Sequence, residues 1–414
     1  MTSLPWNNID CSWLFKNIIP DNVYFYRIFF GQDTLFLASI AKQLKLENKT
    51  LFLVHFEGTA SVIDELYKNF IVPFNFNEEN IILNSTAIDA HEKANFFALK
   101  YKRKPIRTNF YNLWAHMYGD HFFTNSSRLP ELEIAHNLRN NHFPTKTFIC
   151  LNRRWTLHRA VLVALLYKNN LIDSNYVSFS SVHPSQALIK NKVYYNKNLH
   201  TIMKGHSITS VDDHNNLKQI WSKSLPYLQF YHRNNKDVLN ALNEDIINIP
   251  ELKVNESSIF TKTFDTHYGC SNNLDNCQID SLISLVTETC YYSKYHNESD
   301  PSHRYQLHTE NSTSFTEKIW RPIMFKQPFI IVSTPNFLYW LKTLGYKTFH
   351  PYIDESYDME LDDSVRFIKI INELKRLEGL TYTEKQSLIQ YINDITEHNF
   401  QVFKTQFQTF LGTL

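Results

Sequence analysis

Glycine is scarce in this chain, with 8 residues among 414, whereas an ordinary protein contains about 7%. No two glycines are close enough to form even a G-x-G step. The glycine-rich loops that bind dinucleotides or the phosphates of ATP are therefore excluded. A phosphate group would have to be bound by the N-termini of helices and by basic side chains instead.

Paired cysteines, an excess of charge and long apolar runs are also missing. The five cysteines are odd in number and form no C-x-x-C pair, which indicates reduced thiols in the cytoplasm and no metal site. The 42 basic and 41 acidic residues nearly cancel, so the net charge favours neither nucleic acid nor a membrane surface as a partner. No run of about 18 apolar residues predicts a membrane span, and the start of the chain does not resemble a signal peptide.

Alternating strand and helix patterns predict an α/β fold. In the first third of the chain, strand-like runs at 23–30, 51–56 and 81–84 alternate with helical apolar spacing at 34–46 and 61–69. This order is typical of a parallel sheet with crossover helices.

A second α/β unit is predicted to begin at Thr145, after a polar break. Its expected strands are 145–151, 177–180, 280–289, 329–332 and 346–349, and its expected helices are 155–168, 335–344, 359–377 and 383–410. We therefore expect an N-terminal, acceptor-side domain (1–144) and a donor domain (145–380). A C-terminal helix (381–414) would cross back to the N-terminal domain.

Polar residues follow three of the strands that are expected in the second unit. These residues are Asn152-Arg153-Arg154, Glu288, and Thr316-Glu317-Lys318 at the start of a helix. Ligands of parallel α/β domains bind beyond the carboxyl ends of the strands, and Arg forms forked hydrogen bonds to phosphates. Taken singly, each group is also explained by a solvated turn, a polar strand end or a helix cap. Together they predict a nucleotide site.

The expected first unit offers a candidate general base. Glu57 follows the strand that ends at residue 56 and would face the cleft between the two domains, where it could deprotonate an acceptor hydroxyl. Asp89, His91 and Glu92, after the strand at 81–84, are rivals for this role. The basic segment Lys100–Arg107 would suit a polyanion such as DNA, although a charged loop is the commoner explanation.

Together these segments resemble the donor half of a GT-B glycosyltransferase, and in particular the fucosyltransferase-type enzymes. Those enzymes carry a strand that ends in an acidic residue, a T-E-K-[LFI]-[WY]-R helix start and a short strand of the P-V-V kind. The matching residues here are Glu288, Thr316–Arg321 and Pro328–Val332, and Asn152–Arg154 is similar to the family's N-x-R turn. The resemblance covers about residues 145–375 and is strongest to glycosyltransferase-like proteins of phages and large viruses.

The resemblance implies roles for these residues and a fold of two Rossmann-like domains. Lys318 and either Arg153 or Arg154 would hold the diphosphate of the donor, while Glu317 and Glu288 would hold the sugar of the nucleoside. The N-terminal third carries no motif of the family, so neither the acceptor nor the catalytic base follows from the resemblance.

We therefore predict a glycosyltransferase that moves a hexosyl or fucosyl group from a nucleotide-diphosphate sugar to a hydroxyl of a glycan or of a modified DNA base. It would need neither metal nor cofactor, because positive side chains would stabilise the leaving diphosphate. A nucleic-acid-binding or DNA-modifying accessory protein and a degenerate, non-catalytic GT-B fold stay as alternatives. We expect a cytoplasmic location, in the host if the protein is viral. The donor sugar, the nucleotide base, the acceptor, the stereochemistry and the oligomeric state are left open.

Overall fold

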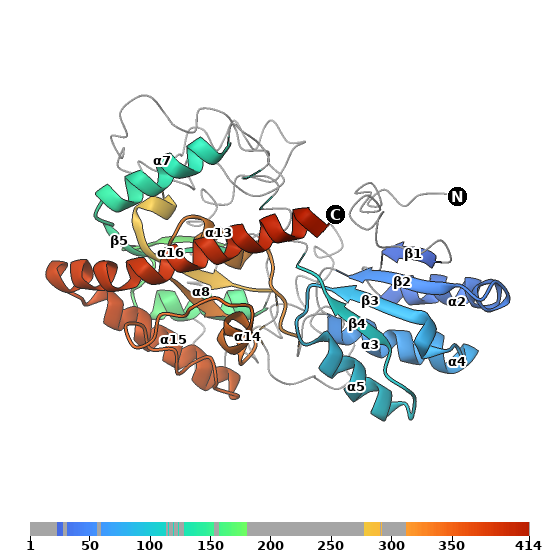
Figure 1. Cartoon of the computed structure of the whole chain (residues 1–414). Helices are drawn as coiled ribbons and strands as arrows, with labels where there is room; N and C mark the ends of the chain where they lie inside the picture. Colours follow the sequence, from blue (N-terminus) through green and yellow to red (C-terminus); the bar gives the residue numbers. More distant parts are fainter. Residues whose placement is uncertain are drawn as a thin grey trace, which may run out of the picture.

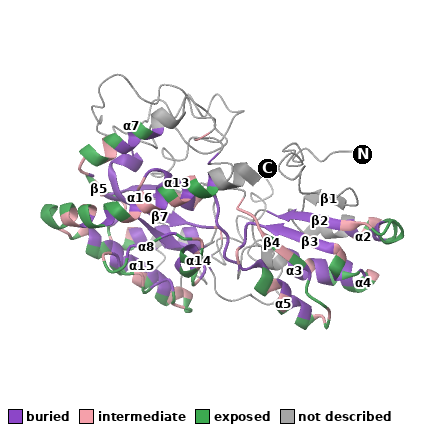
Figure 2. Ribbon diagram, in the orientation of Figure 1, coloured by how far each residue is buried: buried purple, intermediate pink, exposed green. Residues whose placement is uncertain are grey.

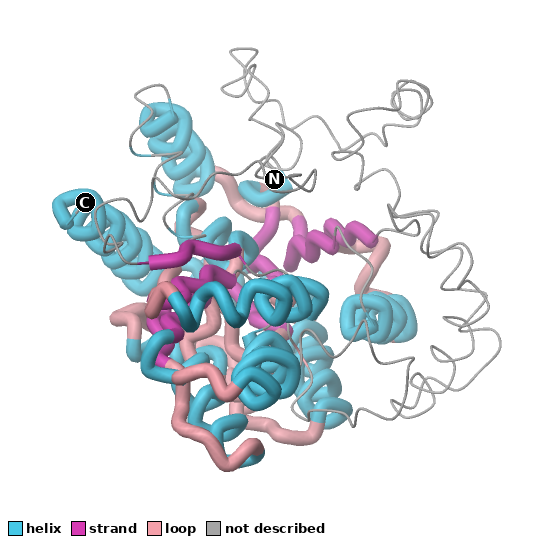
Figure 3. The backbone as a smooth tube through the Cα atoms, turned by 90° about the vertical axis from the view of Figure 1, so that its right-hand side faces the viewer, coloured by secondary structure: helices cyan, strands magenta, loops and turns pink. Residues whose placement is uncertain are grey.

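The protein is an α/β structure with two four-stranded parallel sheets (Figure 1). This computed structural model describes residues 23–27, 31–55, 59–112, 115, 119, 123, 128–152, 157–179, 277–289, 291 and 312–413. Within these residues, most of the strands are drawn as buried in Figure 2, and Figure 3 shows helices packed around them.

The first sheet has its strands in chain order, β1-β2-β3-β4. The strands are β1 (Val23–Arg27), β2 (Thr50–His55), β3 (Ile81–Ser85) and β4 (Arg107–Phe110). The connecting elements are α2 (Gly31–Leu46), α3 (Thr59–Leu66), η1 (Tyr67–Ile71), α4 (Val72–Phe74), η2 (Glu78–Asn80) and α5 (Ala90–Lys100). Alternate strand residues such as Leu51, Leu53 and Leu83 form one hydrophobic core with side chains of α2, α3 and α5, as the period of two in a strand requires.

The second sheet has the order β6-β5-β7-β8. Its strands are β5 (Lys146–Asn152), β6 (Tyr176–Phe179), β7 (Ser281–Thr287) and β8 (Phe329–Val332). All residues of β7 and β8 are buried. Strands with both faces covered are near-continuous apolar runs, which explains why the sequence pattern located these two strands.

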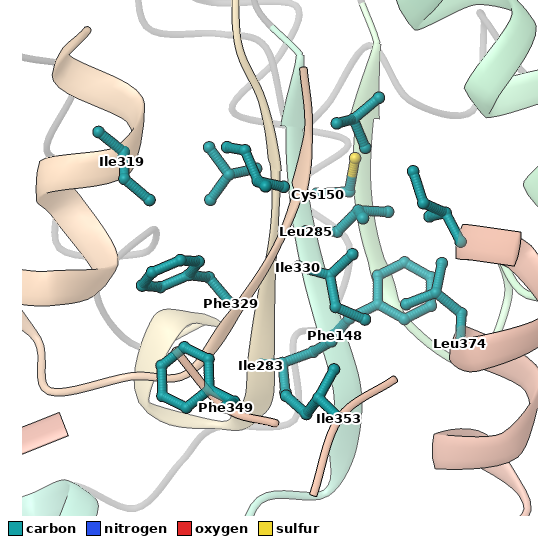
Figure 4. Close-up of a cluster of buried hydrophobic side chains, with 14 of the residues drawn as sticks. Phe148, Cys150, Ile283, Leu285, Ile319, Phe329, Ile330, Phe349, Ile353 and Leu374 are labelled. Carbon is teal, nitrogen blue, oxygen red and sulfur yellow. The ribbon is translucent and has the colours of Figure 1, made fainter. Parts of the chain in front are cut away.

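Helices cover both faces of the second sheet. α8 (Leu157–Lys168) and α15 (Asp363–Glu378) lie on one face, while α7 (Arg128–Asn141), α13 (Glu317–Met324) and α16 (Tyr382–Thr413) lie on the other. Figure 4 shows Ile319 of α13 and Leu374 of α15 on opposite sides of the strands. α14 (Phe337–Thr343) follows β8. Side chains of the strands and of the covering helices form one continuous hydrophobic core.

α16 packs along the second sheet's helices. Its Phe403 lies 5.5 Å from Trp320 of α13, and its Phe400 lies 4.9 Å from His136 of α7, measured between ring centroids. α7 precedes the domain boundary expected at residue 144, yet it contributes Leu132 and Ala135 to the core of the second sheet. The expected return of the last helix to the N-terminal domain stays a prediction.

The strand expected at 346–349 is wrong, because this segment is irregular. Its backbone bonds to side chains instead of to a strand. The Lys347 N–H donates to Asn399 Oδ1 at 2.7 Å, and Asn399 Nδ2 donates to the Lys347 carbonyl at 2.9 Å. A buried side chain of α16 thus satisfies backbone groups that a neighbouring strand would otherwise satisfy.

Candidate functional site

The order of strands in the second sheet creates a topological switch point. From β5 the chain passes through α8 to β6 on one side, whereas β7 pairs with β5 on the other side. In parallel sheets, ligands bind outside the carboxyl ends of the strands at such a point. The four described strands of the first sheet follow chain order and create no such point. The carboxyl ends of β5 and β7 are therefore the place where this fold favours a ligand.

Glu288 follows β7 directly at the switch point and is fully buried. Its Oε1 accepts a hydrogen bond from the Thr316 N–H at 3.2 Å, and its Oε2 accepts one from the Thr316 hydroxyl. Burial raises the pKa of Glu288 above its usual value, although Lys318 opposes that shift. The carboxylate therefore holds the segment before α13 against the end of β7.

Lys318 and Glu317 occupy the first turn of α13, where free backbone N–H groups favour anions. The Lys318 Nζ donates to Glu317 Oε1 at 2.8 Å and to Thr316 Oγ1 at 2.9 Å. Burial opposes ionisation of Glu317, but the Lys318 charge outweighs it and lowers the pKa of Glu317 below its usual value. Glu317 Oε2 is buried without a hydrogen-bond partner among the described residues. The pair thus presents an ammonium group and a spare acceptor together.

The first turn of α8 supports the same strand end. His158 Nε2 lies 3.0 Å from the Glu288 carbonyl, and Arg159 Nη2 donates to the Thr287 carbonyl at 3.1 Å. Burial, followed by the charge of Arg159, lowers the pKa of His158 well below its usual value. Because a carbonyl only accepts, the neutral imidazole carries its proton on Nε2. Arg159 also lowers the pKa of Glu317, so it adds a second positive charge beside the site.

Asn152 ends β5, as the sequence predicts, but its side chain serves the sheet. Its Oδ1 accepts from the Thr287 hydroxyl at 2.7 Å, and its Nδ2 donates to Cys150 Sγ at 3.2 Å. The bond with Thr287 joins the ends of the two central strands, and the bond to Cys150 fixes the amide within β5. Its contribution to a ligand site is therefore to hold β5 and β7 in register.

The carboxyl end of the first sheet contacts the segment that leads into α13. Residues 86–88 follow β3 and pair with residues 313–315. The contact consists of an antiparallel bridge between Ala87 and Ser314 and two hydrogen bonds, from Ile88 N to the Thr313 carbonyl (2.9 Å) and from Phe315 N to the Thr86 carbonyl (3.3 Å). We call this contact the inter-sheet joint. It brings the ends of both sheets to the residues that precede Thr316.

Asp89, one residue beyond the inter-sheet joint, is a buried acid with 4% exposure. Burial raises its pKa to about 6, although Lys93 and the backbone of Thr313 oppose the shift. The Lys93 Nζ lies 3.5 Å from Asp89 Oδ2, whereas Oδ1 is buried without a partner among the described residues. The ionised form of Asp89 therefore costs stability at neutral pH.

Asp89→Asn is expected to stabilise the protein more at high pH than at low pH. The folded pKa of about 6 exceeds the ordinary value of 3.8, so folding favours the protonated form of Asp89. The stability that this form contributes is complete below about pH 3.8 and is lost as the pH rises through about 6. The gain of the variant over the wild type should grow by about 2 kcal/mol between about pH 4.5 and about pH 8. Urea unfolding at both pH values measures this difference.

The matched control for this measurement is Asp64→Asn. Asp64 is also buried, but its carboxylate accepts from Lys100 and from Tyr101, each at 2.9 Å. Its replacement should destabilise the protein, because it breaks satisfied bonds. An Asp89→Asn gain that is the same at both pH values would contradict the raised pKa.

The structure brings some of the predicted site residues together and leaves others untested. Glu288 and Thr316–Lys318 form one hydrogen-bonded group, and Asn152 supports it. Glu57, Arg153 and Arg154 lie outside the described residues. Arg159, which follows the expected basic turn by a few residues and was expected with it to suit a diphosphate, lies close enough to lower the pKa of Glu317.

Three side chains of the basic segment Lys100–Arg107 form ion pairs within the protein, which explains their charge without a polyanion. Lys100 pairs with Asp64, Arg103 with Glu78, and Lys104 with Glu79. Lys100 and Arg103 pair with largely buried carboxylates. The segment also runs into β4, which the sequence analysis did not predict; its alternating residues are half-exposed, so the apolar signal is weak.

Among the described residues, no helix has both the length and the hydrophobicity for a membrane span, and no three His, Cys, Asp or Glu side chains are grouped so that they could hold a metal ion. Comparisons with protein families, curated proteins and solved structures found no match to this chain.

Proposed function

We propose that this protein is a glycosyltransferase that moves a sugar from a nucleotide-diphosphate sugar to an acceptor hydroxyl. The observation that carries the proposal is the position of Glu288, Glu317 and Lys318. These three residues meet at the switch point of the second sheet, where parallel α/β folds bind nucleotides. The second sheet would be the donor half of a GT-B arrangement, and the first sheet would be its acceptor half.

The charges of the group suit a nucleotide sugar. The Lys318 ammonium, at the N-terminus of α13, would bind the diphosphate and stabilise the charge that develops as it leaves. Glu317 and Glu288 would accept hydrogen bonds from the hydroxyls of the nucleoside sugar. The charge of Arg159, which lowers the pKa of Glu317, would offset the negative charge of that carboxylate. Because protein cations supply the positive charge, we propose a metal-independent reaction on a glycan or modified-base hydroxyl.

Lys318→Ala is expected to weaken donor binding by about 10- to 100-fold, because hydrogen bonds to charged groups contribute about 1.5–3 kcal/mol. The test is a thermal-shift screen against UDP-, GDP-, ADP-, CMP- and dTDP-sugars, since a bound ligand raises the melting temperature. One nucleotide class should stabilise the wild type and lose its effect in the variant. The shift and any sugar transfer should persist in EDTA.

Lys369→Ala is the matched control for this screen. Lys369 lies in the same half of the chain, on α15, and its Nζ contacts Glu360 at 2.8 Å, the distance found between Lys318 and Glu317. The Lys369→Ala variant should bind the donor as the wild type does. A wild type that no nucleotide sugar stabilises would count against the transferase, and activity that EDTA abolishes and Mn²⁺ restores would count against metal independence.

A further inference from the structure

The inter-sheet joint places one acid of the first sheet against the segment that carries the donor group. Asp89 occupies the N-cap position of α5, where an Asp side chain ordinarily accepts a hydrogen bond from the first turn of the helix. Here it makes no such cap. Its carboxylate instead interacts with the backbone of Thr313, three residues before Thr316. The side chain thus serves the junction between the sheets rather than its own helix.

Several buried oxygen atoms around the inter-sheet joint lack hydrogen-bond partners among the described residues. They are Asp89 Oδ1, Ser314 Oγ, Glu317 Oε2 and Ser333 Oγ. Ser333 directly follows β8, and Glu288 N donates to the neighbouring Val332 carbonyl at 3.0 Å. Buried polar atoms are nearly always satisfied in folded proteins. Two of the four are carboxylate oxygens, which only accept when ionised, so a ligand that binds them would offer donors such as sugar hydroxyls.

We propose that Asp89 is the general base that activates the acceptor hydroxyl, an inference that rests on the proposed transferase. The Asp89 carboxylate takes the proton of the hydroxyl as the hydroxyl oxygen bonds to the anomeric carbon of the donor sugar. The bond from that carbon to the diphosphate oxygen breaks, and the nucleoside diphosphate leaves with the electron pair beside Lys318. Asp89 thereby replaces Glu57 as the proposed base.

The surroundings of Asp89 suit this role at neutral pH. The charged side chains beside it are Lys93 and Glu92, both from α5, and the facing segment 312–316 contributes only neutral residues. With a pKa of about 6, Asp89 would be ionised at pH 7 yet more basic than an ordinary aspartate. Such a value favours proton transfer in general base catalysis.

Asp89→Asn is expected to lower the rate of sugar transfer by about 10²- to 10⁴-fold while donor affinity stays within about twofold of wild type. The probe is the nucleotide sugar that gives the thermal shift in the panel, with water as the acceptor, and the readout is the nucleoside diphosphate released. The wild-type rate should rise with pH through about 6, and the residual rate of the variant should not. Asp64→Asn, on α3 beside the C-terminal end of α5, should keep the wild-type pH profile.

The outcomes separate this proposal from the transferase itself. If the wild type releases nucleoside diphosphate and Asp89→Asn does so equally fast, the base is wrong and the transferase stands. If Asp89→Asn loses donor binding as well, Asp89 is structural. If the wild type neither binds nor cleaves any donor of the panel, both proposals fail. Higher stability of Asp89→Asn together with its lost rate would exclude misfolding as the cause.

Discussion

Arg366→Ala should lower the free energy of unfolding by about 3–5 kcal/mol, the cost of breaking a buried charged network. Arg366 has 1% exposure. Its guanidinium donates to the Asp363 carboxylate and to the Tyr291 carbonyl, each at 2.6 Å, and to the Glu360 carbonyl at 2.7 Å. It also lies 4.3 Å from the centre of the Tyr291 ring. The truncation would leave three acceptors without this donor, among them the carbonyl of the buried Tyr291.

Urea unfolding measures this loss, and Arg376→Ala is its control. Arg376 lies on the same helix and also contacts a carboxylate, Glu373, at 2.6 Å, but its side chain is 46% exposed. Only the Arg376 side of this pair is open to water, since the Glu373 side chain is 3% exposed, so its loss should be smaller than that of Arg366. Equal losses for the two variants would show that the Arg366 network contributes no more than this half-exposed pair does.

Trp320→Ala should cost about 3–5 kcal/mol of unfolding free energy and weaken donor binding. The Trp320 side chain is fully buried and lies 5.9 Å from Phe315, 5.6 Å from Tyr346 and 5.5 Å from Phe403, measured between ring centroids. Trp320 is two residues from Lys318 on α13. A cavity behind this helix would therefore loosen the first turn that carries the proposed site.

Urea unfolding and the nucleotide-sugar thermal shift together test Trp320→Ala. Trp340→Ala, which removes a half-buried indole from α14, should cost clearly less and leave the donor shift intact. A Trp320→Ala protein that is strongly destabilised yet binds the donor normally would separate the packing of α13 from the proposed site.

The site was predictable from the sequence where strand ends and helix starts coincide with polar residues. β7 and β8 are apolar runs, so the sequence alone could place Glu288 and the start of α13 at one edge of the sheet. Asp89 could be named only as one rival among three, because its burial depends on Thr313, a residue far away in the chain. β4 was missed because only alternate residues of that strand are half-buried, whereas the segment at 346–349 was misassigned because Asn399 of α16 satisfies its backbone.

The pairing of β5 with β7 has a consequence for how the chain folds. It joins residues such as Asn152 and Thr287, which are 135 positions apart, whereas the described strands of the first sheet end at Phe110. Pairing between distant segments is slow, since the intervening loop must close first. During synthesis, the first sheet should therefore form while the strands of the second wait for β7 to leave the ribosome. A ribosome stalled at about residue 240, with β5 outside the exit tunnel and β7 not yet made, should carry a protease-resistant first sheet and an accessible β5.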